Sequence, residues 1–189
     1  MNTVNPTNLA KTEGWIYFVL YIACVPVANW MLGHVGTCGG DGPCVVPVWP
    51  GIMAPSGVLA IGAALVLRDL VQRRLGLRFS LVAIAIGAVI SWFISPPFLV
   101  IASVAAFIFS ETTDALVFTP LQKKGLVTAV IVSSLAGIVV DSVLFLSLAF
   151  HSLDFLAGQI IGKLWAVGAA LPVIWLLRQR ETKSGVQAA

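Results

Sequence analysis

Charged residues are scarce in this chain and make up only 10% of its 189 residues. A soluble domain carries about a quarter charged residues, so the scarcity excludes an ordinary soluble domain. Hydrophobic residues make up 59% of the sequence, which indicates an integral membrane protein. The length accommodates about six spans of roughly 20 residues with short loops. We therefore expect one transmembrane domain, an all-α bundle of six helices over residues 1–189.

Histidine and cysteine are also rare, which argues against metal and nucleophilic chemistry. The two histidines, His34 and His151, lie outside the apolar runs, and the three cysteines show no zinc-site spacing. The sequence contains no Gly-x-Ser-x-Gly, no His-Glu-x-x-His and no phosphate-binding loop. We therefore expect no enzyme activity, no metal ion and no cofactor.

Glycine and proline divide the apolar sequence into six runs, and they are concentrated between residues 36 and 57. The first run, which begins near Trp15, is too long for the core of a signal peptide, so we expect it to remain as a helix. The predicted helices span residues 15–33, 56–74, 79–95, 97–119, 126–150 and 155–177.

Lysine and arginine lie at alternate connections only, while the three remaining loops carry none. Basic residues concentrate on the cytoplasmic side of membrane proteins, so we expect both termini to be cytoplasmic. Because these residues lie at helix ends, where they direct topology, we expect no nucleic-acid partner. They are Lys11, Arg73, Arg74, Arg78, Lys123, Lys124, Arg178, Arg180 and Lys183.

The one long loop, residues 34–56, is therefore expected outside the cytoplasm. It contains Cys38 and Cys44 with five residues between them. In an oxidising compartment these two cysteines could form a disulfide, or they could remain free thiols. Cys24 falls within the first helix and is expected to be a small packing residue.

Six charged side chains fall inside the apolar runs: Arg68, Asp69, Glu111, Asp114, Asp141 and Lys163. A charge at bilayer depth costs several kcal/mol, so such residues usually face a bundle interior or a water-filled cavity and mark a transport path. With a rise of 1.5 Å per residue, Asp141 and Lys163 form an outer layer and the other four a deeper layer. We expect Asp141 to pair with Lys163, and Arg68 to pair with Glu111 or Asp114.

Uncharged polar and aromatic side chains extend this set. Asn29 lies near the end of the first predicted helix, and Gln159 lies one turn before Lys163. Trp92 and Phe107 could stack on a planar solute, or they could be lipid-facing or interfacial anchors. The alternative for the charged set is that its ion pairs only lock the helices together.

Several short motifs occur in order along the chain: Asp69-Leu70 with Gly76, Glu111-x-x-Asp114 with Phe118, Gly137-x-x-x-Asp141, and Gly158-Gln159 with Lys163. Taken together they resemble the vitamin uptake transporter (VUT) family, which includes the bacterial queuosine precursor transporters. Arg68 departs from the family pattern, which commonly has a small polar residue there. The resemblance implies a fold similar to the substrate-binding components of ECF transporters, and uptake of 7-cyano- or 7-aminomethyl-7-deazaguanine across the bacterial inner membrane.

The resemblance implies a substrate site among these residues, where a carboxylate could accept two hydrogen bonds from a guanine-like edge. Glu111, Asp114 and Asp141 are the candidates for that contact. The full candidate set is Asn29, Arg68, Asp69, Trp92, Phe107, Glu111, Asp114, Asp141, Gln159 and Lys163.

Several alternatives stay open at this point. The chain could be a vitamin-binding subunit that needs an ECF-type partner, or a membrane assembly protein that does not transport. A homo-oligomer is also open. The buried carboxylates could carry protons, or they could be static partners of Arg68 and Lys163 in a facilitated-diffusion mechanism.

Overall fold

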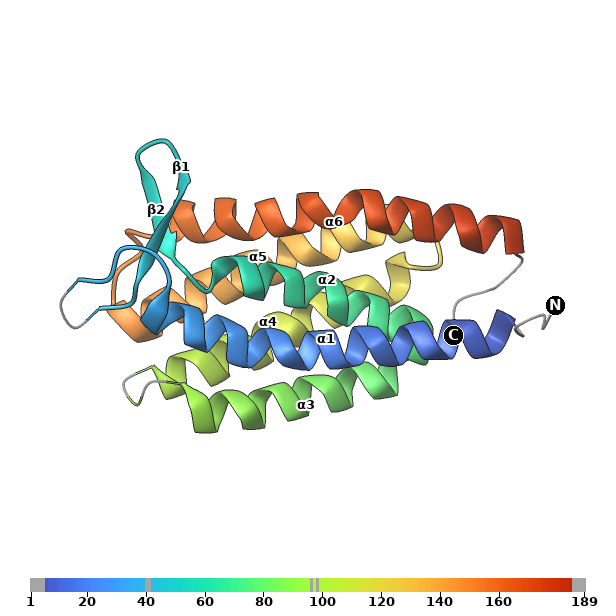
Figure 1. Cartoon of the computed structure of the whole chain (residues 1–189), viewed down its shortest axis with the longest axis horizontal. Helices are drawn as coiled ribbons and strands as arrows, with labels where there is room; N and C mark the ends of the chain where they lie inside the picture. The colour runs from blue at the N-terminus through green and yellow to red at the C-terminus, as the bar shows by residue number, and fades with distance from the viewer. Residues whose placement is uncertain (1–5, 40–41, 96, 98, 185–189) are drawn as a thin grey trace.

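The computed structural model describes residues 6–39, 42–95, 97 and 99–184, with side chains described from residue 10 to residue 181. Within these residues six long helices are found. They lie side by side in one bundle, with a small β-hairpin at one end (Figure 1). The predicted helix over 97–119 begins at Val100 instead, and its residue Phe98 lies outside the described residues. The elements are α1 (Pro6–His34), β1 (Val45–Trp49), β2 (Ile52–Pro55), α2 (Val58–Leu75), α3 (Leu77–Ile94), α4 (Val100–Leu121), α5 (Leu126–Phe150) and α6 (Leu156–Ser184).

Helix α2 lies at the centre of the bundle and contacts each of the other five helices. Those five helices are long and apolar enough to cross a membrane, by the sequence of the described residues. Helix α2 does not meet that description because it carries Arg68, Asp69, Arg73 and Arg74. A helix enclosed by other helices can carry polar side chains, since these meet protein instead of lipid. The central position of α2 therefore explains how a charged helix fits inside an apolar bundle.

Glycines allow the helices around α2 to approach it closely. A Cβ atom added at Gly62 of α2 would lie 2.8 Å from both the Ala166 Cβ and the Lys163 carbonyl oxygen of α6. On α5, a Cβ added at Gly137 would lie 3.0 Å from a methyl group of Leu65. Small residues allow close helix packing in membranes. Here they bring the polar residues of α5 and α6 against α2.

Helix α1 begins earlier, and α6 ends later, than the apolar runs predicted. The added turns are polar and are held by two arginines at the end of α2. Arg74 Nη2 lies 3.0 Å from Glu13 Oε2 of α1, and Arg74 Nη1 lies 2.8 Å from Glu181 Oε1 of α6. Arg73 Nη2 lies 2.7 Å from the second oxygen of Glu181. A reading based on hydropathy ends a helix where polar residues start, so it missed these ion-paired extensions.

The start of α1 and the end of α6 lie at the same end of the bundle, opposite the hairpin (Figure 1). The α2–α3 and α4–α5 connections also lie at that end. The helix ends and connections that carry the basic residues of the topology prediction therefore lie together at the end of the bundle opposite the hairpin. The side chain of Lys183, which belongs to that set, lies outside the described residues.

The predicted loop over residues 34–56 contains an antiparallel β-hairpin that was not predicted. Its turn includes Gly51, whose φ of +76° is a conformation that favours glycine. Trp165 of α6 donates its indole N–H to the Val48 carbonyl at 2.9 Å, and Cys38 and Cys44 form a disulfide. The Trp165 contact holds the hairpin against α6, and the disulfide closes the loop that precedes β1. The β-branched Val45–Trp49 segment before a Pro-Gly pair was the available sequence signal.

Candidate functional site

A cavity lies between the helices near the hairpin end of the bundle. It contains about 540 Å³ of empty space including its opening, and residues from β2 and all six helices line it. Small-molecule sites are mostly apolar with a few polar groups, and the lining of this cavity follows that pattern. The polar lining residues are Asn29, Ser91, Ser103, Asp141 and Gln159, and the aromatic ones are Phe107 and Phe145.

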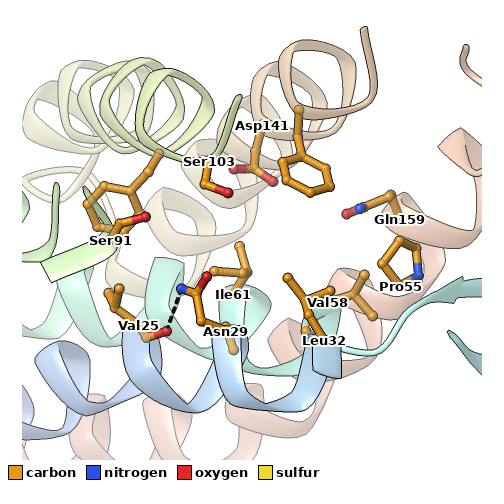
Figure 2. Close-up of a pocket in the computed structure, with 14 residues that line it drawn as sticks. Val25, Asn29, Leu32, Pro55, Val58, Ile61, Ser91, Ser103, Asp141 and Gln159 are labelled. Atoms are coloured by element: carbon orange, nitrogen blue, oxygen red, sulfur yellow. Dashed lines mark hydrogen bonds between the residues drawn. The ribbon is translucent and has the colours of Figure 1, made fainter. Parts of the chain in front are cut away.

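The polar side chains approach the cavity from different sides. Figure 2 shows Asp141 and Ser103 next to one another on the wall that faces Asn29, with Ser91 and Gln159 at opposite ends. Each of the five comes from a different helix: Asp141 from α5, Ser103 from α4, Asn29 from α1, Ser91 from α3 and Gln159 from α6. A ligand in the cavity would therefore contact most of the bundle at once.

Several polar groups of the cavity have unused hydrogen-bonding capacity. Asn29 donates from Nδ2 to the Val25 carbonyl at 3.0 Å, which leaves its side-chain oxygen as an acceptor. Gln159 is only 4% exposed, yet its side-chain amide makes no hydrogen bond to a described residue. Buried polar groups normally have partners. The Asn29 oxygen and the Gln159 amide are therefore available for hydrogen bonds to a polar ligand.

Asp141 and Lys163 form the predicted outer ion pair, which the structure confirms. Lys163 Nζ donates to Asp141 Oδ2 at 2.5 Å and to Ser142 Oγ at 2.9 Å, and the lysine side chain is fully buried. The second oxygen, Asp141 Oδ1, accepts only a long contact of 3.4 Å from Ser110 Oγ. Among the described lining residues Asp141 is the charged one, so Oδ1 is the carboxylate oxygen available to a ligand.

The other four charges form a deeper group, which we name the Arg68 cluster: Arg68, Asp69, Glu111 and Asp114. Arg68 Nη2 lies 2.6 Å from Asp69 Oδ1 and 2.9 Å from Asp114 Oδ1. Arg68 Nε lies 3.3 Å from Glu111 Oε2. The predicted pairing of Arg68 with Glu111 or Asp114 is confirmed for both residues, and Asp69 is an additional partner.

Uncharged residues that the sequence analysis missed fix the orientation of the cluster. Arg68 Nη1 donates to Gln72 Oε1 at 2.9 Å, and Gln72 Nε2 donates to Thr119 Oγ1 at 2.9 Å. Ser133 Oγ donates to Asp69 Oδ2 at 3.0 Å. Gln72 lies one helical turn after Arg68, which was a usable signal. Ser133 and Thr119 lie on other helices and gave no such signal.

The structure divides the predicted site residues into groups. Asn29, Phe107, Asp141 and Gln159 line the cavity. Lys163 lies behind Asp141, and the Arg68 cluster does not line the cavity. The structure does not bring Trp92 to the cavity: its side chain is 56% exposed on the outer face of α3. Phe145, Ser91 and Ser103 line the cavity but were not predicted.

Apolar helices long enough to cross a membrane, charged residues on the central helix and a cavity with polar groups are features that membrane transport proteins share. Residues 91–177 match the family described as "Putative vitamin uptake transporter". This match covers 87 of the 189 residues, a little under half of the chain, and it is to the family that the motifs resemble. Comparisons with curated proteins and with solved structures gave no match.

The family match covers the end of α3, all of α4 and α5, and most of α6. It therefore includes Glu111, Asp114, Asp141 and Lys163, and it supplies the α4, α5 and α6 walls of the cavity. The walls from α1 and α2, with Asn29 and the remaining cluster residues, lie outside the matched segment.

Proposed function

We propose that this chain takes up a queuosine precursor, 7-cyano-7-deazaguanine or 7-aminomethyl-7-deazaguanine, across the bacterial inner membrane. The polar cavity is the observation that carries this proposal. It combines one carboxylate, two side-chain amides and two serine hydroxyls with two aromatic rings. Such a set suits a small, planar, nitrogen-rich ligand with hydrogen-bonding edges.

The proposed binding mode starts from Asp141. Its Oδ1 would accept a hydrogen bond from the N–H and amino edge of the ligand, and a buried charged acceptor makes such a contact strong. The free amide of Gln159 and the oxygen of Asn29 would meet the other polar groups of the ligand. Phe107 and Phe145 would cover its apolar surface. A ligand without the amino edge would leave the buried carboxylate oxygen of Asp141 unpaired. The site would therefore bind such a ligand more weakly than it binds a 7-deazaguanine.

We also propose that all six helices of one transmembrane domain cross the membrane, with the hairpin outside and both termini in the cytoplasm. The gathering of basic residues at the end opposite the hairpin supports this orientation. The partners in this proposal are the lipid bilayer and a small-molecule substrate, with no nucleic acid.

The orientation predicts which cysteines react in intact cells. In a Cys24→Ala background, a membrane-impermeant reductant followed by an impermeant maleimide should label Cys38 and Cys44, because both lie at the hairpin end. The control is Lys123→Cys at the opposite end of the bundle, tested with all native cysteines removed. It should react only after permeabilisation. The reverse pattern would place the termini outside.

The function is tested by rescue of tRNA queuosine. The chain is expressed in a bacterium that lacks both precursor synthesis and its own precursor transporter, and low external 7-cyano-7-deazaguanine is supplied. We expect queuosine to appear on isolated tRNA without an added ATPase module. If the protein reaches the membrane and no queuosine forms, the uptake proposal is wrong. A vitamin-binding subunit with an ECF-type partner would then be the next candidate, in line with the family description.

A further inference from the structure

We propose that the Arg68 cluster is a proton-binding site that couples substrate uptake to proton entry. This inference rests on the proposed uptake function and assigns the cluster a different ligand from that of the cavity. Its basis is the charge of the cluster, its burial and its position directly below the cavity.

The cluster contains more negative than positive groups. Arg68 contributes +1 and the three carboxylates of Asp69, Glu111 and Asp114 contribute −3, so the formal charge is −2 when all are ionised. The side chains of all four residues are at most 2% exposed. Buried charges without a partner are costly, and more so inside a membrane. The excess of carboxylates therefore favours the binding of protons.

A proton suits this geometry better than a metal ion. The guanidinium of Arg68 contacts a carboxylate oxygen of all three acidic residues and so occupies the space between them. Among the described residues no group of three or more acidic, histidine or cysteine side chains is arranged to hold a metal ion. Added positive charge must therefore enter on the carboxylates themselves.

The cluster lies about one helical turn below the floor of the cavity. Phe107 of α4 lines the cavity, and Glu111 follows it by one turn. Ser110, the residue before Glu111, contacts the cavity carboxylate of Asp141 through its hydroxyl. Ser110 therefore connects the cavity carboxylate to the turn of α4 that carries Glu111.

The hydroxyl of Tyr21 is a further buried polar group near the cluster. Tyr21 lies one turn before the cavity residue Val25 on α1, is fully buried, and its oxygen has no hydrogen-bond partner among the described residues. Its ring centroid lies 6.2 Å from that of Phe107, and Glu111 follows Phe107 by one turn of α4. The Tyr21 hydroxyl can donate to an ionised Glu111 or accept from a protonated one, so it can follow a change in the protonation of that carboxylate.

Groups from the surrounding helices complete this environment. Cys24 of α1 packs against the apolar cluster that contains Tyr21 and Phe107. Asp141 of α5 contacts Ser110, the residue before Glu111, and its charge is balanced by Lys163 of α6. The arginine of α3, Arg78, lies in its first turn at the basic end of the bundle. Ligand contact with Asp141 and proton binding to Glu111 therefore act on neighbouring charges and should influence one another.

The proposed step is the reversible protonation of one carboxylate. One proton from the outer side adds to one carboxylate, with Glu111 the nearest to the cavity, and converts it to the neutral acid. When the bundle opens to the cytoplasm, the acid releases that proton, and the carboxylate is restored. No other reactant is needed.

The test uses the full chain in liposomes and labelled 7-cyano-7-deazaguanine. The readout is the ratio of accumulation with acid outside to accumulation without a gradient, at zero membrane potential. For one proton per substrate, one pH unit should give a ratio of about ten, since a tenfold concentration ratio balances a tenfold proton ratio. In Glu111→Gln the ratio should fall to about one. Asp154→Asn, an exposed carboxylate in the α5–α6 connection, should keep the ratio of the unaltered chain.

Each outcome decides the proposal. A ratio near one in the unaltered chain, with uptake present, overturns the proton site and leaves the uptake function standing. Absence of uptake under every condition overturns both. If Glu111→Gln does not fold, a pH-sensitive dye inside liposomes of the unaltered chain decides: substrate should acidify the lumen, and no acidification contradicts the proposal.

Discussion

Replacement of Asp141 by asparagine should reduce uptake of the proposed substrate by about tenfold or more. Asp141 Oδ1 accepts only the long contact from Ser110 among the described residues, so the change removes the charge-assisted hydrogen bond that we propose it makes to the ligand. Such bonds contribute roughly 1.5–3 kcal/mol, and 1.4 kcal/mol corresponds to a factor of ten. The measurement is the initial rate of labelled precursor uptake, normalised to the protein found in the membrane. The exposed Asp154→Asn variant is the matched control and should be unaffected.

A second variant separates binding from folding. Asp141→Asn leaves the fully buried Lys163 without its carboxylate, and breaking a buried ion pair costs about 3–5 kcal/mol. Combining it with Lys163→Met removes the unpaired charge and should restore the melting temperature, while uptake stays low. If the stable double variant transports normally, Asp141 acts only in helix packing and the cavity proposal is contradicted.

Replacement of Arg68 by methionine should be the most destabilising of the changes considered. Arg68 is the common partner of three buried carboxylates, and its removal leaves them without a positive charge. We expect a loss of about 3–5 kcal/mol in the free energy of unfolding, measured as unfolding in detergent. Glu111→Gln should cost much less, because Arg68 then still has two carboxylate partners.

Two controls make this prediction specific. Lys124→Met removes an exposed cation in the α4–α5 connection and should change stability by less than about 0.5 kcal/mol. Adding Glu111→Gln and Asp114→Asn to Arg68→Met should recover most of the lost stability, because fewer unpaired carboxylates remain. An Arg68→Met protein as stable as the unaltered chain would show that the ion pairs of the cluster do not hold the helices together.

The sequence predicted the charged contacts because a charge inside an apolar run has few possible partners. That constraint identified the Asp141–Lys163 pair and two partners of Arg68, and the structure confirms them. It did not separate residues that line the cavity from residues below it. Helical depth placed Asp141 and Glu111 in different layers, but only the packing of α1, α4 and α5 decides which layer is open to a ligand.

Other features could not be predicted for identifiable physical reasons. Helix α3 is apolar on nearly every side, so its sequence does not tell which face meets lipid, and Trp92 was placed at the site although it lies on the outer surface. The hairpin is short and lies between long apolar helices, so a search for spans passes over it. The polar ends of α1 and α6 depend on ion pairs with Arg73 and Arg74, which are distant in sequence.

The most direct test of the cavity as the substrate site is equilibrium binding to the purified chain in detergent or nanodiscs, with no partner protein present. The titrant is 7-cyano-7-deazaguanine, and the stable Asp141→Asn, Lys163→Met variant is measured beside the unaltered chain. We predict saturable binding to the unaltered chain and binding at least about tenfold weaker to the variant. Equal affinity for both proteins, or no binding to the folded unaltered chain, would contradict it.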